Sequence, residues 1–136
     1  MLFRSEPPEW LPAAGQGAIA IQIRADDEAT RALVAPLGDS ETMLDTRAER
    51  AFLGALEGGC QVPIGALSAA SDTGRTLWGM LSDVSGRHVV RGQMPLDLSE
   101  PELTGVRLAN DLRHRGGNEI LDSLRRAQHL PSPQPE

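Results

Sequence analysis

Two short clusters of turn-forming residues, SDTGR at 71–75 and DVSGR at 83–87, divide the middle of the chain into three strand-like segments. These largely apolar segments are QVPIGALSAA at 61–70, TLWGMLSD at 76–83 and HVVRGQMPL at 88–96. Connections this short favour antiparallel neighbours, because a parallel connection needs a crossover of about a dozen residues or more. The sequence therefore predicts a small antiparallel sheet, with Pro63 marking an edge or an irregular start of the first strand.

A long helix is predicted before these strands, in ETMLDTRAERAFLGALE at 41–57. Either Asp39 or Ser40 can serve as its N-cap, and Gly58 and Gly59 supply the left-handed conformation that ends a helix. Its apolar residues recur every three or four positions and form one stripe: Leu44, Ala48, Ala51, Phe52, Ala55 and Leu56. The stripe predicts that this helix packs on the sheet.

Two further helices are predicted after the strands. Ser99 begins a capping box with Glu102 at the third helical position, and it leads into LTGVRLANDLRHR at 103–115. A pair of glycines ends this helix, and Asn118 can cap the next one, EILDSLRRAQH at 119–129. The order of one helix, three strands and two helices predicts an α+β fold, a three-stranded antiparallel sheet covered by helices on one face.

The segment before the long helix has a different pattern. AIAIQIR at 18–24 alternates, with the isoleucines on one side, and this predicts a half-buried strand. A short helix is predicted next, in EATRALVAPL at 28–37, with Leu33 and Val34 facing inward. A strand and a short helix are therefore predicted before the α+β domain.

Composition and charge exclude several classes of protein. The formal net charge is −6, and the 13 basic residues are all arginines. An acidic chain is a poor ligand for phosphate backbones, so no nucleic-acid partner is expected. The sequence shows no leader pattern and no apolar run long enough to cross a bilayer, so no membrane partner is expected either. One cysteine cannot form an internal disulfide, which fits a reducing, cytoplasmic location.

The single cysteine, Cys60, follows Gly58 and Gly59 at the corner between the long helix and the first strand. One interpretation is a reactive thiol in a loop where the glycines allow another molecule close to the backbone. The other is a small buried hydrophobic residue, which is the commoner fate of a free cysteine. Arg47 and Arg50 could supply positive charge to the thiol, but a solvated helix face explains them equally well. The residue pattern leaves both interpretations open.

Other candidate groups in the sequence indicate no chemistry. The histidines His88, His114 and His129 are isolated from one another and from Cys60, so a metal site is not expected. The triplet GQG at 15–17 precedes a predicted strand, whereas a dinucleotide-binding loop follows one and opens into a helix. These glycines therefore predict a tight turn.

Two stretches in register resemble the hydroxymethylbilane synthase family, also called porphobilinogen deaminase. The pattern T-x-A-E-R-A-F-L-x-A-L-E-G-G-C-Q-V-P-I-G-A at 46–66 resembles the cofactor-attachment region of that family. PAAGQGAIAIQIRADD at 12–27 resembles the segment that precedes it at the same distance. The resemblance implies a dipyrromethane cofactor held by a thioether. The implied cofactor-binding residues are Cys60, which carries the thioether, Gly58, Gly59 and Gln16.

The resemblance also implies an activity. The family polymerises four porphobilinogen units into hydroxymethylbilane in tetrapyrrole and haem biosynthesis, so the implied partner is a porphobilinogen-derived pyrrole chain. A soft thiolate suits the capture of a carbon electrophile, and Cys60 is expected to act as an anchor that primes polymerisation.

The family is expected to have two α/β lobes and a smaller α+β domain, and this chain resembles only the C-terminal part. Residues 1–38 are expected to be a linker, strand and short helix that belong to an absent N-terminal lobe, 39–130 the cofactor-bearing domain, and 131–136 a disordered tail. No catalytic residue is expected in this chain, which is predicted to be a truncated or split enzyme that needs a separate N-terminal catalytic half. The alternative is a non-enzymatic binding or oligomerisation module that keeps the fold and pairs through its exposed isoleucine strand.

Overall fold

The computed structural model describes residues 9–56, 62–72 and 74–128 of the 136-residue chain. At its centre is a three-stranded sheet in the order β1-β2-β3. The strands are β1 (Ile64–Ser71), β2 (Gly74–Ser82) and β3 (Val89–Pro95). Both strand pairs are antiparallel, as the short turns predicted. Strand β1 lies at an edge of the sheet and begins directly after Pro63, which confirms the expected position of that proline.

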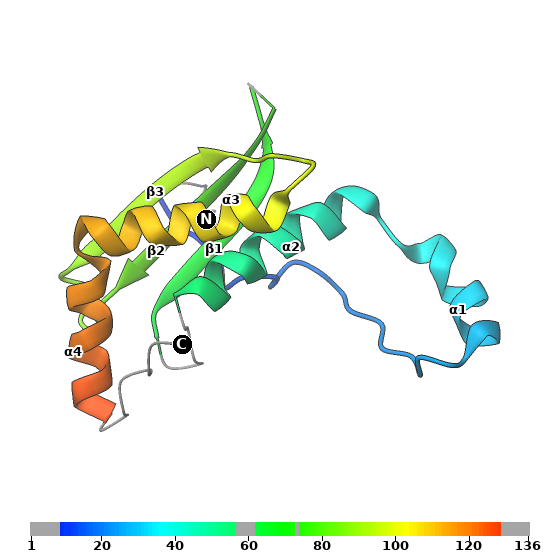
Figure 1. Cartoon of the computed structure of the whole chain (residues 1–136), viewed down its shortest axis with the longest axis horizontal. Coiled ribbons are helices and arrows are strands. Elements are labelled where there is room, and N and C mark those ends of the chain that lie inside the picture. The colour runs from blue at the N-terminus through cyan, green and yellow to red at the C-terminus, as the bar shows by residue number, and fades with distance from the viewer. Residues whose placement is uncertain (1–8, 57–61, 73, 129–136) are drawn as a thin grey trace, which may run out of the picture.

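Two helices, α2 (Ser40–Ala55) and α3 (Pro101–Leu112), lie side by side against one face of the sheet (Figure 1). A third, α4 (Asn118–Gln128), turns away at one end of the domain and is joined to α3 by the kinked turn η2 (Arg113–Gly117). The described part of the chain therefore has the predicted α+β architecture, with its helices on one face of the antiparallel sheet.

Helix α2 forms where the sequence predicted it. Asp39 is the N-cap, and its carboxylate accepts a 2.7 Å hydrogen bond from the backbone N–H of Thr42. The predicted stripe faces the sheet, with Ala48, Phe52 and Leu56 fully buried. The helix ends at Ala55 with Leu56 as its C-cap, and the glycines predicted to stop it lie outside the described residues.

A row of small residues lets the helices approach the sheet closely. Ala66, Gly79 and Gly92 are cross-strand neighbours in register on the three strands. A Cβ atom on Gly79 would lie 2.5 Å from the ring of Phe52, and one on Gly92 would lie 2.8 Å from the side chain of Leu112. The core therefore consists of large side chains from the helices set against a flat, nearly side-chain-free strip of the sheet.

The two helices that cover the sheet also touch each other closely, at Gly105 of α3. A Cβ atom at this position would lie 2.3 Å from the carbonyl oxygen of Ala48 and 2.8 Å from the backbone nitrogen of Phe52. Both of those atoms belong to the backbone of α2. The backbones of α2 and α3 thus meet with no room for a side chain between them.

The predicted capping box at the start of α3 is wrong. The N-cap is Glu100 and the helix begins at Pro101, without a side-chain hydrogen bond at the cap. Proline has no N–H to be capped and its fixed φ suits the first helical position, so it sets the start one residue later than Ser99 would. Glu102 instead pairs with Arg47 of α2.

The predicted end of the α3 segment at the glycine pair is confirmed. The helical backbone breaks in η2 at Arg115 and Gly116, where Gly116 has φ 110° and ψ −3°. Only a glycine adopts this conformation without strain, so it marks the kink between the helices. Asn118 is the first residue of α4 and was expected to cap it from outside.

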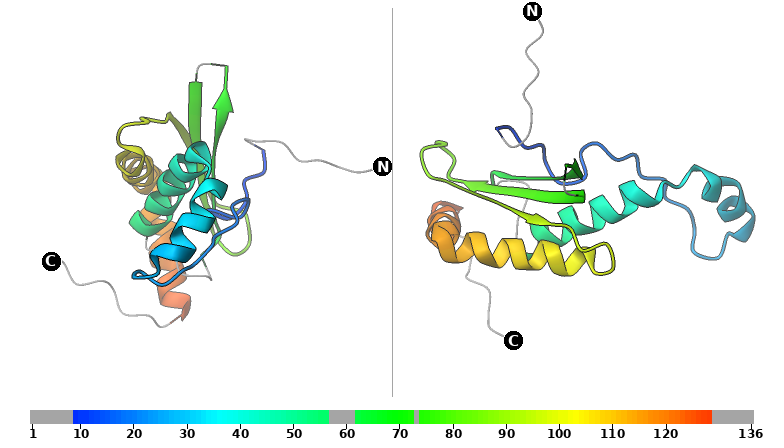
Figure 2. Two further views of the ribbon diagram at one scale, coloured as in Figure 1. Left: turned by 90° about the vertical axis from the view of Figure 1, so that its right-hand side faces the viewer. Right: turned by 90° about the horizontal axis from the view of Figure 1, so that it is seen from above.

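Residues 9–17, called the strap below, cross the sheet on the face opposite to the helices (Figure 2, right). Leu11 is 7% exposed and packs on Gly65 of β1, where a Cβ atom would lie 2.9 Å from that of Leu11. The guanidinium of Arg91, on the same face of β3, donates a 2.8 Å hydrogen bond to the Glu9 carbonyl. The strap therefore belongs to the packed domain.

Residues 18–38, called the arm below, extend away from the domain (Figures 1 and 2). The strand predicted at 18–24 does not form, and Ile19 is 96% exposed. A strand needs a hydrogen-bonded neighbour, and within the described residues none is offered to this segment.

The arm also holds the short helix α1 (Glu28–Val34) and the 3₁₀ turn η1 (Ala35–Leu37). Helix α1 starts where the sequence predicted, with Asp27 as its N-cap. The inward orientation predicted for Leu33 is wrong, because this side chain is 78% exposed and α1 buries no residue. Both errors have one cause, since the arm's apolar side chains have no core to face in this part of the chain.

Candidate functional site

The residues that the sequence singled out most strongly, Cys60, Gly58 and Gly59, lie outside the described residues. The segment that holds them connects the end of α2 to the start of β1. Leu56, at the helix end, is fully buried, and Val62, before the strand, packs against the same core. The two attachment points of the candidate segment are therefore anchored in the hydrophobic core.

Gln16 lies in a tight turn of the strap, as the GQG triplet predicted. Gly15 has φ 72°, and the Gln16 N–H donates a 3.1 Å hydrogen bond to the Ala13 carbonyl. The side-chain Oε1 of Gln16 accepts a 3.1 Å hydrogen bond from the Ala13 N–H. The described contacts of Gln16 thus close its own turn, and its role beside a cofactor stays a prediction.

A buried carboxylate, Glu49, connects this turn to the rest of the domain. Its side chain is on α2 and the residue is 5% exposed. Oε2 accepts a 2.7 Å hydrogen bond from the Gly15 N–H, and Oε1 accepts a 2.7 Å hydrogen bond from the Ser68 N–H of β1. Burial raises the pKa of the Glu49 carboxyl above its usual value, although the hydrogen bonds from both backbone N–H groups oppose that rise.

Sequence reasoning missed Glu49 as a functional candidate. A glutamate in a helix on the surface of a domain is usually solvated. The signal that could have found it is its spacing, because Glu49 lies three residues before Phe52 and seven before Leu56, on the inward side of α2.

Three other charged residues of α2 pair with residues of neighbouring elements. Arg47 makes two hydrogen bonds to Glu102 of α3, at 2.5 and 2.9 Å, and these bonds lower the pKa of Glu102. Arg75 of β2 bridges Asp45 and Glu41, and its pKa is raised mainly by the hydrogen bonds to Asp45. Arg47, considered as a source of charge for the thiol, is thus engaged with another helix.

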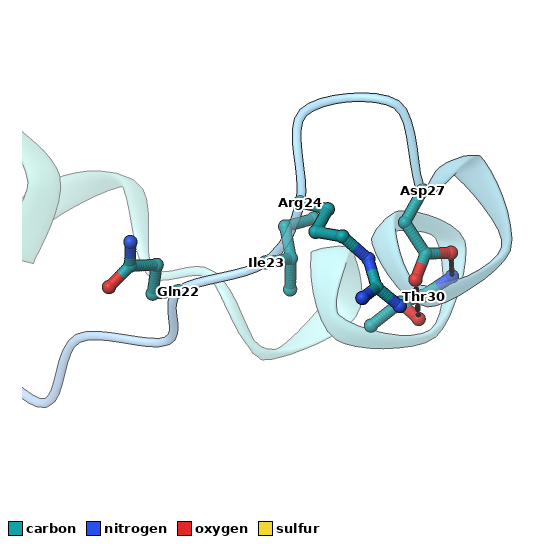
Figure 3. A pocket seen from close by; sticks show the side chains of 5 residues that line it. All are labelled: Gln22, Ile23, Arg24, Asp27 and Thr30. Atoms are coloured by element: carbon teal, nitrogen blue, oxygen red, sulfur yellow. Dashed lines mark hydrogen bonds between the residues drawn. The ribbon is translucent and has the colours of Figure 1, made fainter.

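The described residues line shallow surface depressions, two of which are candidate sites. One, of about 510 Å³, lies between the β2–β3 turn and the junction of α3 with α4, and Arg87, His88 and Arg115 are among its lining residues. The other, of about 470 Å³, is in the arm. Figure 3 shows the residues that line it, which are Gln22, Ile23, Arg24, Asp27 and Thr30. Gln16, the predicted cofactor-binding residue that lies within the described part of the chain, lines neither depression.

Neither a cluster of metal-ligating side chains nor a membrane-spanning helix is found in the described part of the chain. Within residues 9–56, 62–72 and 74–128, no group of three or more His, Cys, Asp or Glu side chains is placed to hold a metal ion. In the same part of the chain, every helix is too short or too polar to cross a bilayer.

Comparison with known families defines the class of protein. The family model for the C-terminal domain of porphobilinogen deaminase matches residues 43–114, which run from α2 through the sheet and α3 to the start of η2. This match covers more than half of the chain and every element that packs against the core strip. The chain belongs to the porphobilinogen deaminase family, and the matched domain is the C-terminal one of that family.

Curated relatives give the same result. The chain is 46% identical over 115 residues to a porphobilinogen deaminase of Moorella thermoacetica and 43% identical over 116 residues to one of Carboxydothermus hydrogenoformans. Each alignment covers 85% of this chain and 37% of the relative. A porphobilinogen deaminase of Syntrophotalea carbinolica is 40% identical over 114 residues, covering 84% of this chain and 36% of the relative. The chain thus spans just over a third of the length of these relatives.

Proposed function

We propose that this chain is the cofactor-bearing C-terminal portion of a hydroxymethylbilane synthase, a transferase of haem biosynthesis that joins four porphobilinogen units in the cytoplasm. The observation that supports this most directly is the family match over 43–114, which includes the segment EGGCQVPIGA at 57–66. The porphobilinogen-derived pyrrole chain is then the ligand that this domain carries.

Cys60 is the proposed point of covalent attachment for dipyrromethane. It is the one thiol in the sequence, and thiolate sulfur is the protein nucleophile best suited to bond a carbon electrophile. Gly58 and Gly59 have no side chains to block a group beside the thiol, so the residues present fit the cofactor. When bound, dipyrromethane supplies the pyrrole terminus on which the product is built. We further propose that Gln16, through its side-chain amide, lies near that group.

The exposed arm is the proposed contact with the remainder of the enzyme. Ile19, Ile21, Leu33 and Leu37 are 96, 54, 78 and 71% exposed. Apolar surface gathered on one projecting segment indicates a binding surface, and about 63% of each of the first two relatives has no counterpart in this chain. We propose that the arm docks on the N-terminal portion of the enzyme, whether that portion is on the same or a separate polypeptide, and that the catalytic residues come from there.

The proposed domain limits follow from this assignment. Residues 1–38 include the arm proposed to contact the N-terminal portion, and residues 39–130 form the cofactor-bearing domain. Residues 131–136, which the sequence predicts to be a disordered tail, lie outside the described residues. The strap contacts the domain although it precedes the limit at 38.

The experiment that tests the proposal is intact mass spectrometry of the chain incubated with preformed hydroxymethylbilane. Samples are prepared with and without the N-terminal portion of the Moorella thermoacetica relative, and Cys60→Ser is the control. We expect an adduct that requires Cys60 and forms fastest when the N-terminal portion is present. An adduct on the Cys60→Ser chain would assign the cofactor to another residue. An unmodified thiol in every sample would refute the proposal.

The alternative, a non-enzymatic oligomerisation module, predicts a different behaviour of the arm. In that case the exposed isoleucines would pair with a second copy of the chain. Size-exclusion chromatography distinguishes the two hypotheses. A stable homodimer that does not bind the N-terminal portion favours the oligomerisation module. A monomer that binds this portion favours the enzyme.

A further inference from the structure

Glu49 is a buried charged group that the proposed chemistry does not use. Each of its two oxygens accepts one backbone N–H at 2.7 Å, from Gly15 and from Ser68. This is the pattern of an ionised carboxylate, which accepts at both oxygens and donates at neither. Burying such a group costs free energy unless it is fully hydrogen-bonded, so its presence at 5% exposure requires an explanation.

The path of the strap provides that explanation. After crossing the outer face of the sheet, the strap passes the edge of β1, where the Pro12 carbonyl accepts a 2.9 Å hydrogen bond from the Ala66 N–H. It then reaches α2, on the other face, where Gly15 donates to Glu49. The strap therefore wraps around the sheet edge, and the contact with Glu49 is its last described hydrogen bond to the domain before the arm departs (Figure 2).

We propose that Glu49 is a positioning residue that fixes the turn at 15–17, and with it the direction in which the arm leaves the domain. It does so from α2, the helix that leads directly to the Cys60 segment. The proposal deepens the proposed function, on which its catalytic consequence rests. The carboxylate holds the root of the arm, and the turn that contains Gln16, at a constant position relative to α2.

The chemistry of the site predicts what an amide would do in place of the carboxylate. Glutamine has one acceptor oxygen and one NH₂ donor, so Glu49→Gln can satisfy only one of the two N–H groups and sets a donor against the other. The Ser68 N–H lies in a buried hydrogen bond, whereas the Gly15 N–H is partly buried and can turn to water. The amide oxygen is therefore expected to keep Ser68, and the variant is expected to release Gly15 selectively.

The test is amide hydrogen exchange followed by NMR on the unaltered chain, Glu49→Gln and Glu119→Gln. Glu119 is exposed near the start of α4, so its variant makes the same charge change far from the strap. We expect the Gly15 amide to exchange at least tenfold faster in Glu49→Gln and its proton resonance to move upfield. The amides of Ser68 and of α3 should keep their rates, and Glu119→Gln should match the unaltered chain.

Two results would overturn the proposal. One is an unchanged Gly15 amide in Glu49→Gln. The other is equal acceleration across Gly15, the sheet and α3, which would show that Glu49 serves global stability alone. If Glu49→Gln does not fold, the unaltered chain still decides the matter, because a latched Gly15 amide must exchange far more slowly than the amide of the exposed residue Ile19.

The functional consequence has a separate readout. In the Cys60 loading experiment with the N-terminal portion present, we expect Glu49→Gln to load more slowly and Glu119→Gln to load normally. Equal loading rates would overturn the catalytic part of this inference and leave the proposed function standing. Failure of the unaltered chain to load would refute the proposed function, while the exchange result, which needs neither cofactor nor partner, would stand on its own.

Discussion

Gly105→Ala tests the close approach of α2 and α3 that gives this domain its shape. The new Cβ would lie 2.3 Å from the Ala48 carbonyl oxygen and 2.8 Å from the Phe52 nitrogen. These are backbone atoms inside a helix, so no side-chain rotation relieves the overlap. The helices must separate by about 1 Å, which forfeits roughly a quarter to a half of the dispersion attraction between the atoms that face each other.

The expected loss of stability follows from two opposing terms. Overpacking of a well-packed core costs about 1–3 kcal/mol, and a clash of the new Cβ atom with the backbone of a helix belongs at the upper end of that range. Alanine regains about 1 kcal/mol over glycine in a helix, so we expect the free energy of unfolding to fall by about 2 kcal/mol.

Urea denaturation monitored by circular dichroism measures this difference. Gly54→Ala is the matched control, because Gly54 lies in α2 and a Cβ atom added there would meet nothing within 4 Å. That variant should be up to about 1 kcal/mol more stable than the unaltered chain. If Gly105→Ala proves as stable as the unaltered chain, the helices do not meet as described and the reasoning fails.

Three further results are expected. Cys60→Ser should leave the fold intact, and a loss of more than about 2 kcal/mol in urea denaturation would instead indicate a core cysteine. Ile19→Ser, at a side chain 96% exposed, should change the free energy of unfolding by less than about 0.5 kcal/mol while weakening binding to the N-terminal portion of the enzyme in titration calorimetry, and unweakened binding would exclude Ile19 from the contact. Because burial raises the pKa of Glu49 above 4.5, the folded state binds the proton more tightly than the unfolded state, and stability contributed by this group falls as pH rises above about 4.5. Urea denaturation at a series of pH values should show that fall in the unaltered chain relative to Glu49→Gln, and parallel curves would contradict it.

The parts of the fold that the sequence predicted are those set by local signals. The turn clusters at 71–75 and 83–87 place three antiparallel strands, and the stripe that includes Phe52 places α2 against them. The start of α3 was missed by one residue because two local signals compete there, and the proline prevails over the serine cap.

The arm and the buried carboxylate could not be predicted in the same way. Alternation at 18–24 is typical of a half-buried strand, but the pattern carries no information about whether a neighbouring strand is present. The hydrogen bond between Glu49 and Gly15 joins residues 34 apart in sequence, and no local pattern encodes such a contact. The segment around Cys60 is recognisable only through its likeness to a family, since the chemistry of one thiol between glycines is compatible with several roles.

The arm begins and ends at fixed points on the same domain. The hydrogen bond from Gly15 to Glu49 fixes its start, and the Asp39 N-cap of α2 fixes its end. The arm is therefore a closed loop of the domain. The entropic free energy of closing such a loop rises slowly with its length, by about 0.6 kcal/mol for each doubling. Insertions, deletions and substitutions between these points should scarcely alter how the domain folds. The sequence of the arm can thus evolve with its binding partner, while the packing of the domain is maintained independently.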